Sequence, residues 1–276
     1  MRNDGRDTPR SLFCLHPSSF ILHPSSFILL KSLRLALGFL TSVPIRADAM
    51  QPGDLGRAAM WFPLVGLALG AALSAAHFLL GQLFSPLLAA ALTVALWAAL
   101  TGGLHLDGLA DCCDGLLAST TRERRLEIMR DPRLGAYGDI GLFIFLILKI
   151  LAISSIHHLP PSGSSSFILH PLLLAPPLAR WLILLVATQP SARPGGMGAD
   201  FALGLKPAVF IVAAIIPLAL IALGGARAIA AAVAAHALAL GIIALARNQI
   251  GGVTGDVFGL TIEAGELATL LVFAAA

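Results

Sequence analysis

The stretch LAAALTVALWAALTGGLHLDGLADCCDGLL, residues 88–117, decides the fold class of this chain. Its first part belongs to an apolar block at about 84–104. A block of roughly 20 apolar residues is long enough to cross a bilayer as a helix. Its second part places Asp107, Asp111 and Asp114 directly after that block. The stretch therefore predicts a membrane span that is followed at once by a cluster of acids.

The composition agrees with a membrane protein. The chain has 276 residues, of which 57% are hydrophobic and 12% charged, whereas soluble domains carry about 25% charged residues. The net charge is only +3, and the basic residues lie between apolar blocks rather than in one patch, which argues against nucleic-acid binding. The three cysteines, Cys14, Cys112 and Cys113, form neither a disulfide framework nor a metal-binding spacing.

Apolar blocks of helical length recur along the chain. Backbone inside a bilayer must satisfy its own hydrogen bonds, so these blocks are expected to be helices. Together with a short apolar helix at about 32–43, they predict an all-α polytopic membrane bundle of about seven transmembrane helices. The blocks lie at about 58–82, 84–104, 140–157, 172–189, 207–224, 228–246 and 260–276.

A repeated heptapeptide marks segments that we expect to lie outside the functional fold. SSFILHP occurs at 18–24 and again at 165–171. Structural repeats are longer and contiguous, so a short distant copy is more typical of a translated DNA repeat. We expect residues 1–31 to be a non-functional extension and 32–276 to form one membrane domain with an inserted loop at about 160–171. A targeting segment is the alternative for 1–31.

The distribution of Lys and Arg predicts the orientation. If the polar connection 105–139 faces the cytoplasm, alternation places 45–57, 190–206 and 247–259 on the same side. The opposite side then holds only Arg227, which is a strong positive-inside bias. We therefore expect an inner-membrane protein whose acidic site faces the cytoplasm. The basic residues of that side are Arg46, Arg57, Arg122, Arg124, Arg125, Arg130, Arg133, Arg193, Lys206 and Arg247.

The motif HLDGLADCCDG, residues 105–115, carries the predicted metal site. Asp107, Asp111 and Asp114 are spaced i, i+4 and i+7, which places them within about 60° of one helix face. Carboxylates this close repel one another unless a cation joins them. Hard oxygen ligands suit Mg²⁺ or Mn²⁺. A solvated acidic helix face is the alternative reading.

Arginines follow the acids in RERRLEIMRDPRLGAYGD, residues 122–139. Guanidinium groups offer forked donors that match phosphate oxygens. Arg130 and Arg133 flank Asp131, so the pattern predicts a Mg²⁺-diphosphate site with metal on one side and guanidinium on the other. Anchoring at the inner face is the alternative for Arg124 and Arg125.

Three further features add candidate ligand contacts. The Gly-rich loop GGVTGDVFG, residues 251–259, resembles an anion nest, and Glu263 and Glu266 after it are expected only to favour a helix N-terminus. Lys149 and Arg180 lie in the middle of apolar blocks, where an ionisable residue usually faces a cavity or a partner. His105 is either a contact of the site or an ordinary interfacial histidine.

Five segments in this order resemble the cobalamin synthase family, the adenosylcobinamide-GDP ribazoletransferases. They are LALGFLTSVPI (35–45), HLDGLADCCDGLL (105–117), LEIMRDPRLGAYG (126–138), ARPGGMG (192–198) and GGVTGDVFG (251–259). The resemblance covers about 33–276 apart from 160–171. It implies a Mg²⁺-dependent reaction in which a hydroxyl of α-ribazole, or of its 5′-phosphate, attacks adenosylcobinamide-GDP, releasing GMP and forming adenosylcobalamin or its phosphate.

The resemblance also suggests roles for the candidate residues. Asp107, Asp111 and Asp114 would hold metal, and Asp131 would complete the metal site or accept the hydroxyl proton. Arg130 and Arg133 would neutralise charge on the transferring phosphoryl group. The remaining candidates for substrate binding are His105, Arg122, Lys149, Arg180, Arg193, Thr254 and Asp256. The expected partners are the two substrates and the lipid bilayer, and the sequence leaves a homo-oligomer open.

Two other functions stay open at the level of the sequence. CDP-alcohol phosphotransferases carry a related acidic motif, but Ser119 stands where they have arginine and Phe143 where they have their last acid. A membrane transporter is the other alternative. The acids lie on one helix face, and the chain shows no internal repeat of the kind many transporters have.

Overall fold

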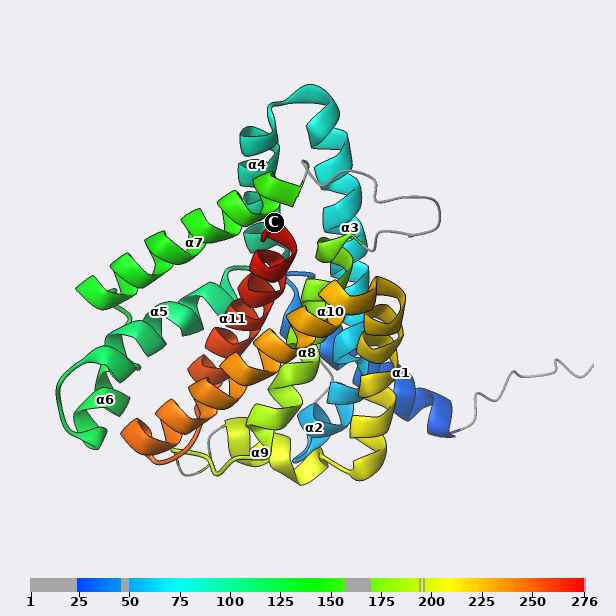
Figure 1. Ribbon diagram of the computed structural model, residues 1–276. Coiled ribbons are helices and arrows are strands. Elements are labelled where there is room, and N and C mark those ends of the chain that lie inside the picture. The colour runs from blue at the N-terminus through cyan, green and yellow to red at the C-terminus, as the bar shows by residue number, and fades with distance from the viewer. Residues whose placement is uncertain (1–23, 46–49, 157–169, 194, 196, 276) are drawn as a thin grey trace, which may run out of the picture.

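The computed structural model describes residues 24–45, 50–156, 170–193, 195 and 197–275, and these fold into a bundle of α-helices (Figure 1). Within them, the only strand-like pairing is an isolated bridge between Ser191 and Val253. The helices are α1 (Pro24–Leu40), α2 (Asp54–Ala58), η1 (Ala59–Trp61), α3 (Phe62–Leu83), α4 (Pro86–Thr101), α5 (Leu104–Leu117), α6 (Arg122–Ile128), α7 (Ala136–Ile156), α8 (Pro171–Ala187), α9 (Met197–Gly204), α10 (Pro207–Ile250) and α11 (Gly255–Ala274).

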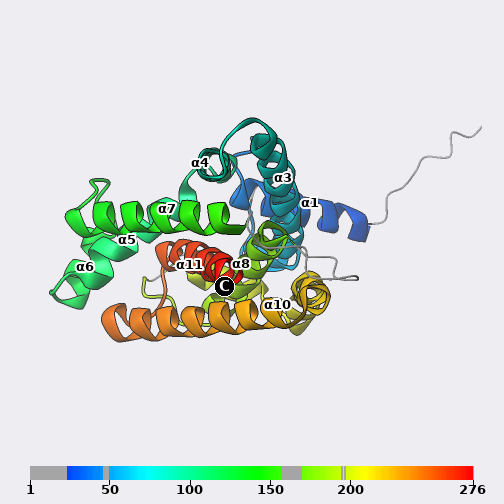
Figure 2. The same ribbon diagram turned by 45° about the horizontal axis from the view of Figure 1, so that its top comes forward.

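The last helix, α11, is the centre of the bundle. It packs against α5, α7, α8 and α10, and both views show it enclosed by them (Figures 1 and 2). Helix α3 packs against α8, and the α3–α4 hairpin extends the bundle at one end. Helices α2 and α9 pack together at the opposite end. The position of α11 therefore relates these four helices to one another.

Helices α4 and α5 are joined by a sharp elbow rather than by a loop. Helices α4 and α5 meet at 94°. Gly102 and Gly103 form the corner, with φ angles of 65° and 69° that side-chain-bearing residues rarely adopt. The segment 105–139, which we expected to be a polar connection, contains α5, α6 and the start of α7. Only the short breaks between these helices are loops.

An all-α membrane bundle is confirmed, but the number of seven spans is not. In the described residues, four helices are long and apolar enough to cross a bilayer, or five if the bent pair α4–α5 is one span. Helix α8 is an apolar helix of 17 residues, shorter than these candidate spans. The blocks predicted at 207–224 and 228–246 form one long element, α10, interrupted at Gly225 where φ is 63°. The two predicted helices are therefore continuous except for a break in the helical backbone at Gly225, and no loop connects them.

The first helix begins inside the predicted extension 1–31 rather than at about residue 32. Helix α1 begins at Pro24, and Lys31 pairs with Asp54 at 2.8 Å. Residues 1–23 and 160–169 lie outside the described residues, so the extension and the inserted loop stay predictions.

Glycines allow α3 and α8 to approach closely. A Cβ atom placed on Gly70 would collide with the carbonyl oxygen of Leu172, and one on Gly66 would lie 2.8 Å from the backbone of Pro176. Backbone cannot yield as a flexible side chain does, so these positions accept only glycine without a shift of α8. Gly241 in α10 differs, because no described atom lies within 4 Å of its Cβ position.

We predict that Gly70→Ala destabilises the protein by about 1–3 kcal/mol, because the added methyl overpacks the contact between α3 and α8. The matched control Gly241→Ala should be neutral or slightly stabilising, since alanine favours a helix. Thermal unfolding of the purified protein in detergent measures both. Equal midpoints for the two variants would contradict the proposed packing.

Candidate functional site

The end of α1 fixes the elbow from which α5 emerges. Ser42 donates its hydroxyl to the carbonyl oxygen of Ala99 and its backbone N–H to that of Leu100, both at 2.8 Å. These carbonyls lie in the last turn of α4, where a helix leaves carbonyl groups without an i+4 donor. Ser42 belongs to the segment 35–45 that carried the family resemblance. Its role here is to cap α4 and so to direct α5.

Helices α5 and α11 touch through glycines. A Cβ atom on Gly108 would lie 3.1 Å from the Cα of Asp256, and one on Gly259 would lie 3.2 Å from the Cα of Gly108. This close crossing brings Asp256, at the start of α11, beside the acids of α5. The negative fields of Asp256, Asp107 and Asp114 all act on Asp111, and Arg193 opposes them. Asp256 therefore joins the acids of α5 that act on Asp111, and a metal site at these residues stays a prediction.

Asp114 occupies a different position from the other acids. It is 9% exposed, and its two carboxylate oxygens accept the backbone N–H groups of Gly135 at 2.8 Å and Gly138 at 2.9 Å. A Cβ atom on either glycine would collide with this carboxylate. Asp114 therefore caps the start of α7 from a neighbouring helix. That it also binds metal stays a prediction.

The described residues contain no group of three or more His, Cys, Asp or Glu side chains arranged to hold a metal ion by themselves. Mg²⁺ seldom needs such a cage, because it usually takes one or two carboxylates together with waters and substrate phosphates. Asp107, Asp111 and Asp256 offer only hard oxygen atoms and act on one another electrostatically. This donor set fits a site that a phosphorylated substrate completes.

The arginines of the α5–α7 region divide into two groups. Arg125 is buried and donates to the carbonyl oxygens of Gly115 at 3.0 Å and Leu116 at 2.7 Å, so it caps the end of α5. Arg124 forms an exposed pair with Glu127 at 2.8 Å. These two contacts support a structural role for both residues.

Three further arginines of this region are exposed. The guanidinium of Arg122 lies against Gly251, with Nη2 2.8 Å from the position of a Cβ atom there. Arg130 is exposed, and Arg133 forms two hydrogen bonds to Asp131, at 2.9 and 2.7 Å. The Arg133 guanidinium holds the pKa of Asp131 at about 2, below its usual 3.8. A carboxylate with so low a pKa is a poor proton acceptor at neutral pH.

We predict that Asp131 contributes no titration to the pH profile of activity above pH 4. Its folded pKa is depressed, so the ion pair with Arg133 is fully present above 3.8 and is lost only as pH falls through about 2. The rate–pH profile of Asp131→Asn should keep the acid limb of the parent protein and differ only in amplitude. A shifted acid limb between pH 5 and 7 would identify Asp131 as a proton acceptor.

The loop 190–193 joins the site to α11. Ala192 donates its N–H to Val253, and Val253 donates to Pro190, both at 2.9 Å. Arg193 then lies 3.5 Å from Asp256 and donates to the carbonyl oxygen of Leu126 at 3.4 Å. Of the predicted loop 251–259, only residues 251–254 precede α11, which begins at Gly255. Val253 in that short loop is held against residues 190–192, and Arg193 is a positive charge among the acids.

Thr254 is part of the same arrangement but faces inward. It is 3% exposed, and its hydroxyl donates to Asp256 at 3.1 Å. This bond orients the carboxylate of Asp256 at the start of α11. The structure therefore brings together Asp107, Asp111, Asp256, Arg193 and Thr254, whereas Lys149 and Arg180 take part in a separate network.

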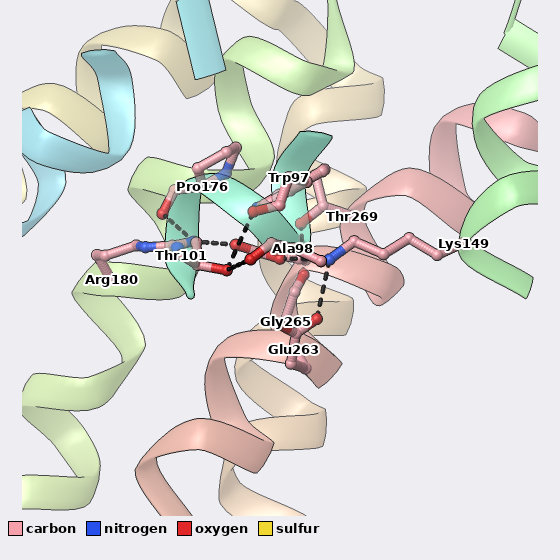
Figure 3. A network of polar contacts seen from close by, with 10 residues as sticks. Trp97, Ala98, Thr101, Lys149, Pro176, Arg180, Glu263, Gly265 and Thr269 are labelled. Carbon is pink, nitrogen blue, oxygen red and sulfur yellow. Dashed lines mark hydrogen bonds and ion pairs between the residues drawn. The ribbon is translucent and has the colours of Figure 1, made fainter. Parts of the chain in front are cut away.

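A buried network of four charges lies within the bundle (Figure 3). Lys149 on α7 pairs with Glu263 at 2.8 Å and Glu266 at 2.7 Å, and Arg180 on α8 pairs with Glu266. All four residues are at most 2% exposed. Figure 3 shows Lys149 and Arg180 approaching Glu263 and its neighbours from opposite sides. The indole ring of Trp97 lies 3.8 Å from the Lys149 ammonium.

The network corrects the role that the sequence predicts for Glu263 and Glu266. We expected them only to favour a helix N-terminus, but they lie inside the bundle and neutralise Lys149 and Arg180. The signal was present in the sequence: two acids at i, i+3 in one apolar block match two bases in other blocks. Lys149 and Arg180 face acidic partners within the protein, and the predicted role of these two residues in substrate binding stays a prediction.

We predict that Lys149→Met destabilises the bundle by about 3–5 kcal/mol, because it leaves a buried carboxylate without its cation. The double variant Lys149→Met/Glu263→Gln should recover part of that loss, since it removes one charge of each sign. Lys206→Met changes an exposed lysine and provides the control. Unfolding temperatures in detergent measure all three. A double variant less stable than Lys149→Met would contradict the pairing.

Fold and site together define a membrane-embedded helical protein with a polar site rich in carboxylates and arginines. The sequence profile of the cobalamin-5-phosphate synthase family matches residues 32–274. The chain therefore belongs to that family and is a transferase of cobalamin biosynthesis.

Curated relatives cover nearly the same region. Proteins named adenosylcobinamide-GDP ribazoletransferase are 41% identical in Stutzerimonas stutzeri, over 87% of this chain and 96% of the relative, and 42% identical in Pseudomonas aeruginosa, over 89% and 98%. A relative of the same name from Desulfitobacterium hafniense is 36% identical over 88% and 96%. No solved structure matches the chain.

Proposed function

We propose that this chain joins adenosylcobinamide-GDP to α-ribazole or its 5′-phosphate and releases GMP. A ribose hydroxyl of the acceptor forms a new P–O bond to the cobinamide-side phosphorus, while the P–O bond to GMP breaks and the hydroxyl proton leaves. The products are adenosylcobalamin, or its phosphate, and GMP. The observation that carries this proposal is the agreement between relatives of that name along almost the whole chain and an acid-and-arginine site on α5 and α11.

The acids are suited to bind the diphosphate through Mg²⁺. Asp107 and Asp111 on α5 and Asp256 on α11 would hold the ion, which would offset the charge of the diphosphate. The glycine contact between Gly108 and α11 is what places carboxylates of two helices side by side. Substrate phosphates supply the remaining oxygen ligands, so the site is completed only when the donor binds.

The remaining site residues either hold other groups in position or neutralise negative charge. Arg193 lies beside Asp256, and the exposed Arg122, Arg130 and Arg133 follow α5 in the chain. Their guanidinium groups would bind phosphoryl oxygens, where charge increases during transfer. Asp114 holds the start of α7 against α5. Asp131, with its low pKa, orients Arg133 rather than accepting a proton.

The proposed orientation follows from charge. Arg122, Arg130, Arg133 and Arg193 lie on the connections between spans that carry the acidic site, and basic connections stay on the cytoplasmic side of an inner membrane. Nucleotide substrates are cytoplasmic solutes, so a site on that face would meet both without transport. The bilayer would solvate the exposed apolar faces of α7 and α10, which include Phe143, Ile211 and Leu218.

We predict that Asp111→Asn lowers turnover by at least about a thousandfold, because loss of a carboxylate weakens the proposed metal site at the transferring phosphate. Membrane insertion and the unfolding temperature should be unchanged, since Asp111 is partly exposed. The assay follows GMP and cobalamin release in detergent with Mg²⁺, adenosylcobinamide-GDP and α-ribazole.

Glu123→Gln provides the matched control, because Glu123 is an exposed acid in the first turn of α6. It should retain nearly full turnover. Near-normal turnover of Asp111→Asn would refute the metal assignment. Absence of GMP release by the unmodified protein, with turnover of CDP-alcohol substrates instead, would refute the proposed function.

A further inference from the structure

A pocket of about 110 Å³ lies beside the acid cluster, between α1, α5 and α11. Its polar end holds Asp107, Asp256 and His105. The other lining side chains are apolar, namely Phe39, Leu104, Phe258 and Ile262. The pocket thus continues the proposed diphosphate site into an apolar, partly aromatic chamber. A ligand with one polar and one apolar aromatic part fits this distribution.

His105 gives the pocket an unpaired polar atom. The residue is 3% exposed, and its Nε2 has no hydrogen-bond partner among the described residues. Buried polar groups are nearly always paired, so an orphan atom in a pocket wall indicates a missing ligand or water. A neutral imidazole nitrogen can donate or accept one hydrogen bond, depending on the tautomer. The chamber therefore offers a single such contact in an otherwise apolar wall.

The aromatic wall is held in place before any ligand binds. The ring of Phe39 stacks on that of Phe62 with centroids 5.6 Å apart, and Phe62 is fully buried. Phe258 is 3% exposed and packs against Phe201, with centroids 5.5 Å apart. Rigid aromatic walls of this kind favour a flat ring over a flexible chain, because less conformational freedom is lost on binding.

We propose that this pocket binds the acceptor nucleoside, with its aromatic base in the apolar chamber and its ribose toward Asp107 and Asp256. The inference rests on the proposed function and deepens it. A benzimidazole base linked to ribose through one ring nitrogen has one free ring nitrogen and an apolar edge. His105 Nε2 is the partner for that nitrogen, and Leu104 and Phe39 contact the ring. The ribose oxygens then lie beside the carboxylates that would hold the diphosphate.

Hydrogen bonding disfavours binding of guanosine, the nucleoside of the proposed donor, in this pocket. Guanine carries several donors and acceptors on its edges, and an apolar wall would leave most of them unpaired. Unpaired polar groups reject a ligand more strongly than a missing methyl group does. The guanosine of the donor is therefore assigned to the arginine side of the site rather than to this chamber.

Calorimetric titration of α-ribazole, and separately of GDP, into the full-length protein in detergent with Mg²⁺ tests the proposal. His105→Leu should weaken α-ribazole binding about tenfold or more, the effect expected for one lost buried hydrogen bond, and leave GDP binding unchanged. His105→Gln, whose amide nitrogen reaches a similar position, should restore part of the affinity. His236→Leu replaces a histidine elsewhere in the bundle, where it bonds Trp181, and should alter neither affinity.

Leu104 provides a second test that does not depend on a buried position, because it is 52% exposed. Leu104→Ala should weaken binding of dimethylbenzimidazole riboside about fivefold through lost apolar contact and have less effect on unsubstituted benzimidazole riboside. Unchanged α-ribazole binding in both variants, or weakened GDP binding instead, would overturn the assignment while leaving turnover by the unmodified protein intact. Failure of the unmodified protein to release GMP would count against the proposed function itself.

Discussion

Charge neutrality inside the apolar bundle is the constraint on which the rest of the structure depends. Glu263 and Glu266 lie on the central helix, α11, and they pair with Lys149 on α7 and with Arg180 on α8. A buried charge without a partner is strongly destabilising, so these pairs admit one register of α11 against its two neighbours. That register determines where α11 begins. It is the start of α11, at Asp256, that meets the acids of α5.

A second set of contacts fixes α5 by satisfying helix ends. Ser42 caps α4 just before the elbow, Arg125 caps the end of α5, and Asp114 caps the start of α7. Each contact pairs backbone groups that a helix terminus leaves free. The acidic helix is thus held in place by side chains that bond the backbone at helix ends. Segments that resemble the family motifs therefore include residues whose role is to hold backbone in place.

The apolar blocks and the spacing of Asp107, Asp111 and Asp114 predicted the all-α membrane fold and the position of the acid cluster, because hydrophobic length and helical periodicity are local properties of a sequence. The 94° elbow, the break at Gly225 and the partner of each buried charge are not local. Asp114 shows the limit: its spacing is that of a cluster member, yet both its oxygens bond the backbone of α7. Only the path of the chain after Gly115 reveals that contact.

The buried network and the acid cluster differ in how far their charges are compensated within the protein. The proposed reaction site is the cluster whose charge is less compensated. In the buried network two acids meet two bases, so these four charges compensate one another within the protein. In the acid cluster the fields of Asp107, Asp114 and Asp256 all raise the energy of ionised Asp111, and Arg193 opposes them. Carboxylates gathered by a glycine contact and only partly compensated bind cations more strongly than isolated ones. In the proposed function, a cation bound together with the diphosphate would relieve the repulsion among these carboxylates, so the free energy of donor binding would include the strain that the α5–α11 contact imposes on the unliganded protein.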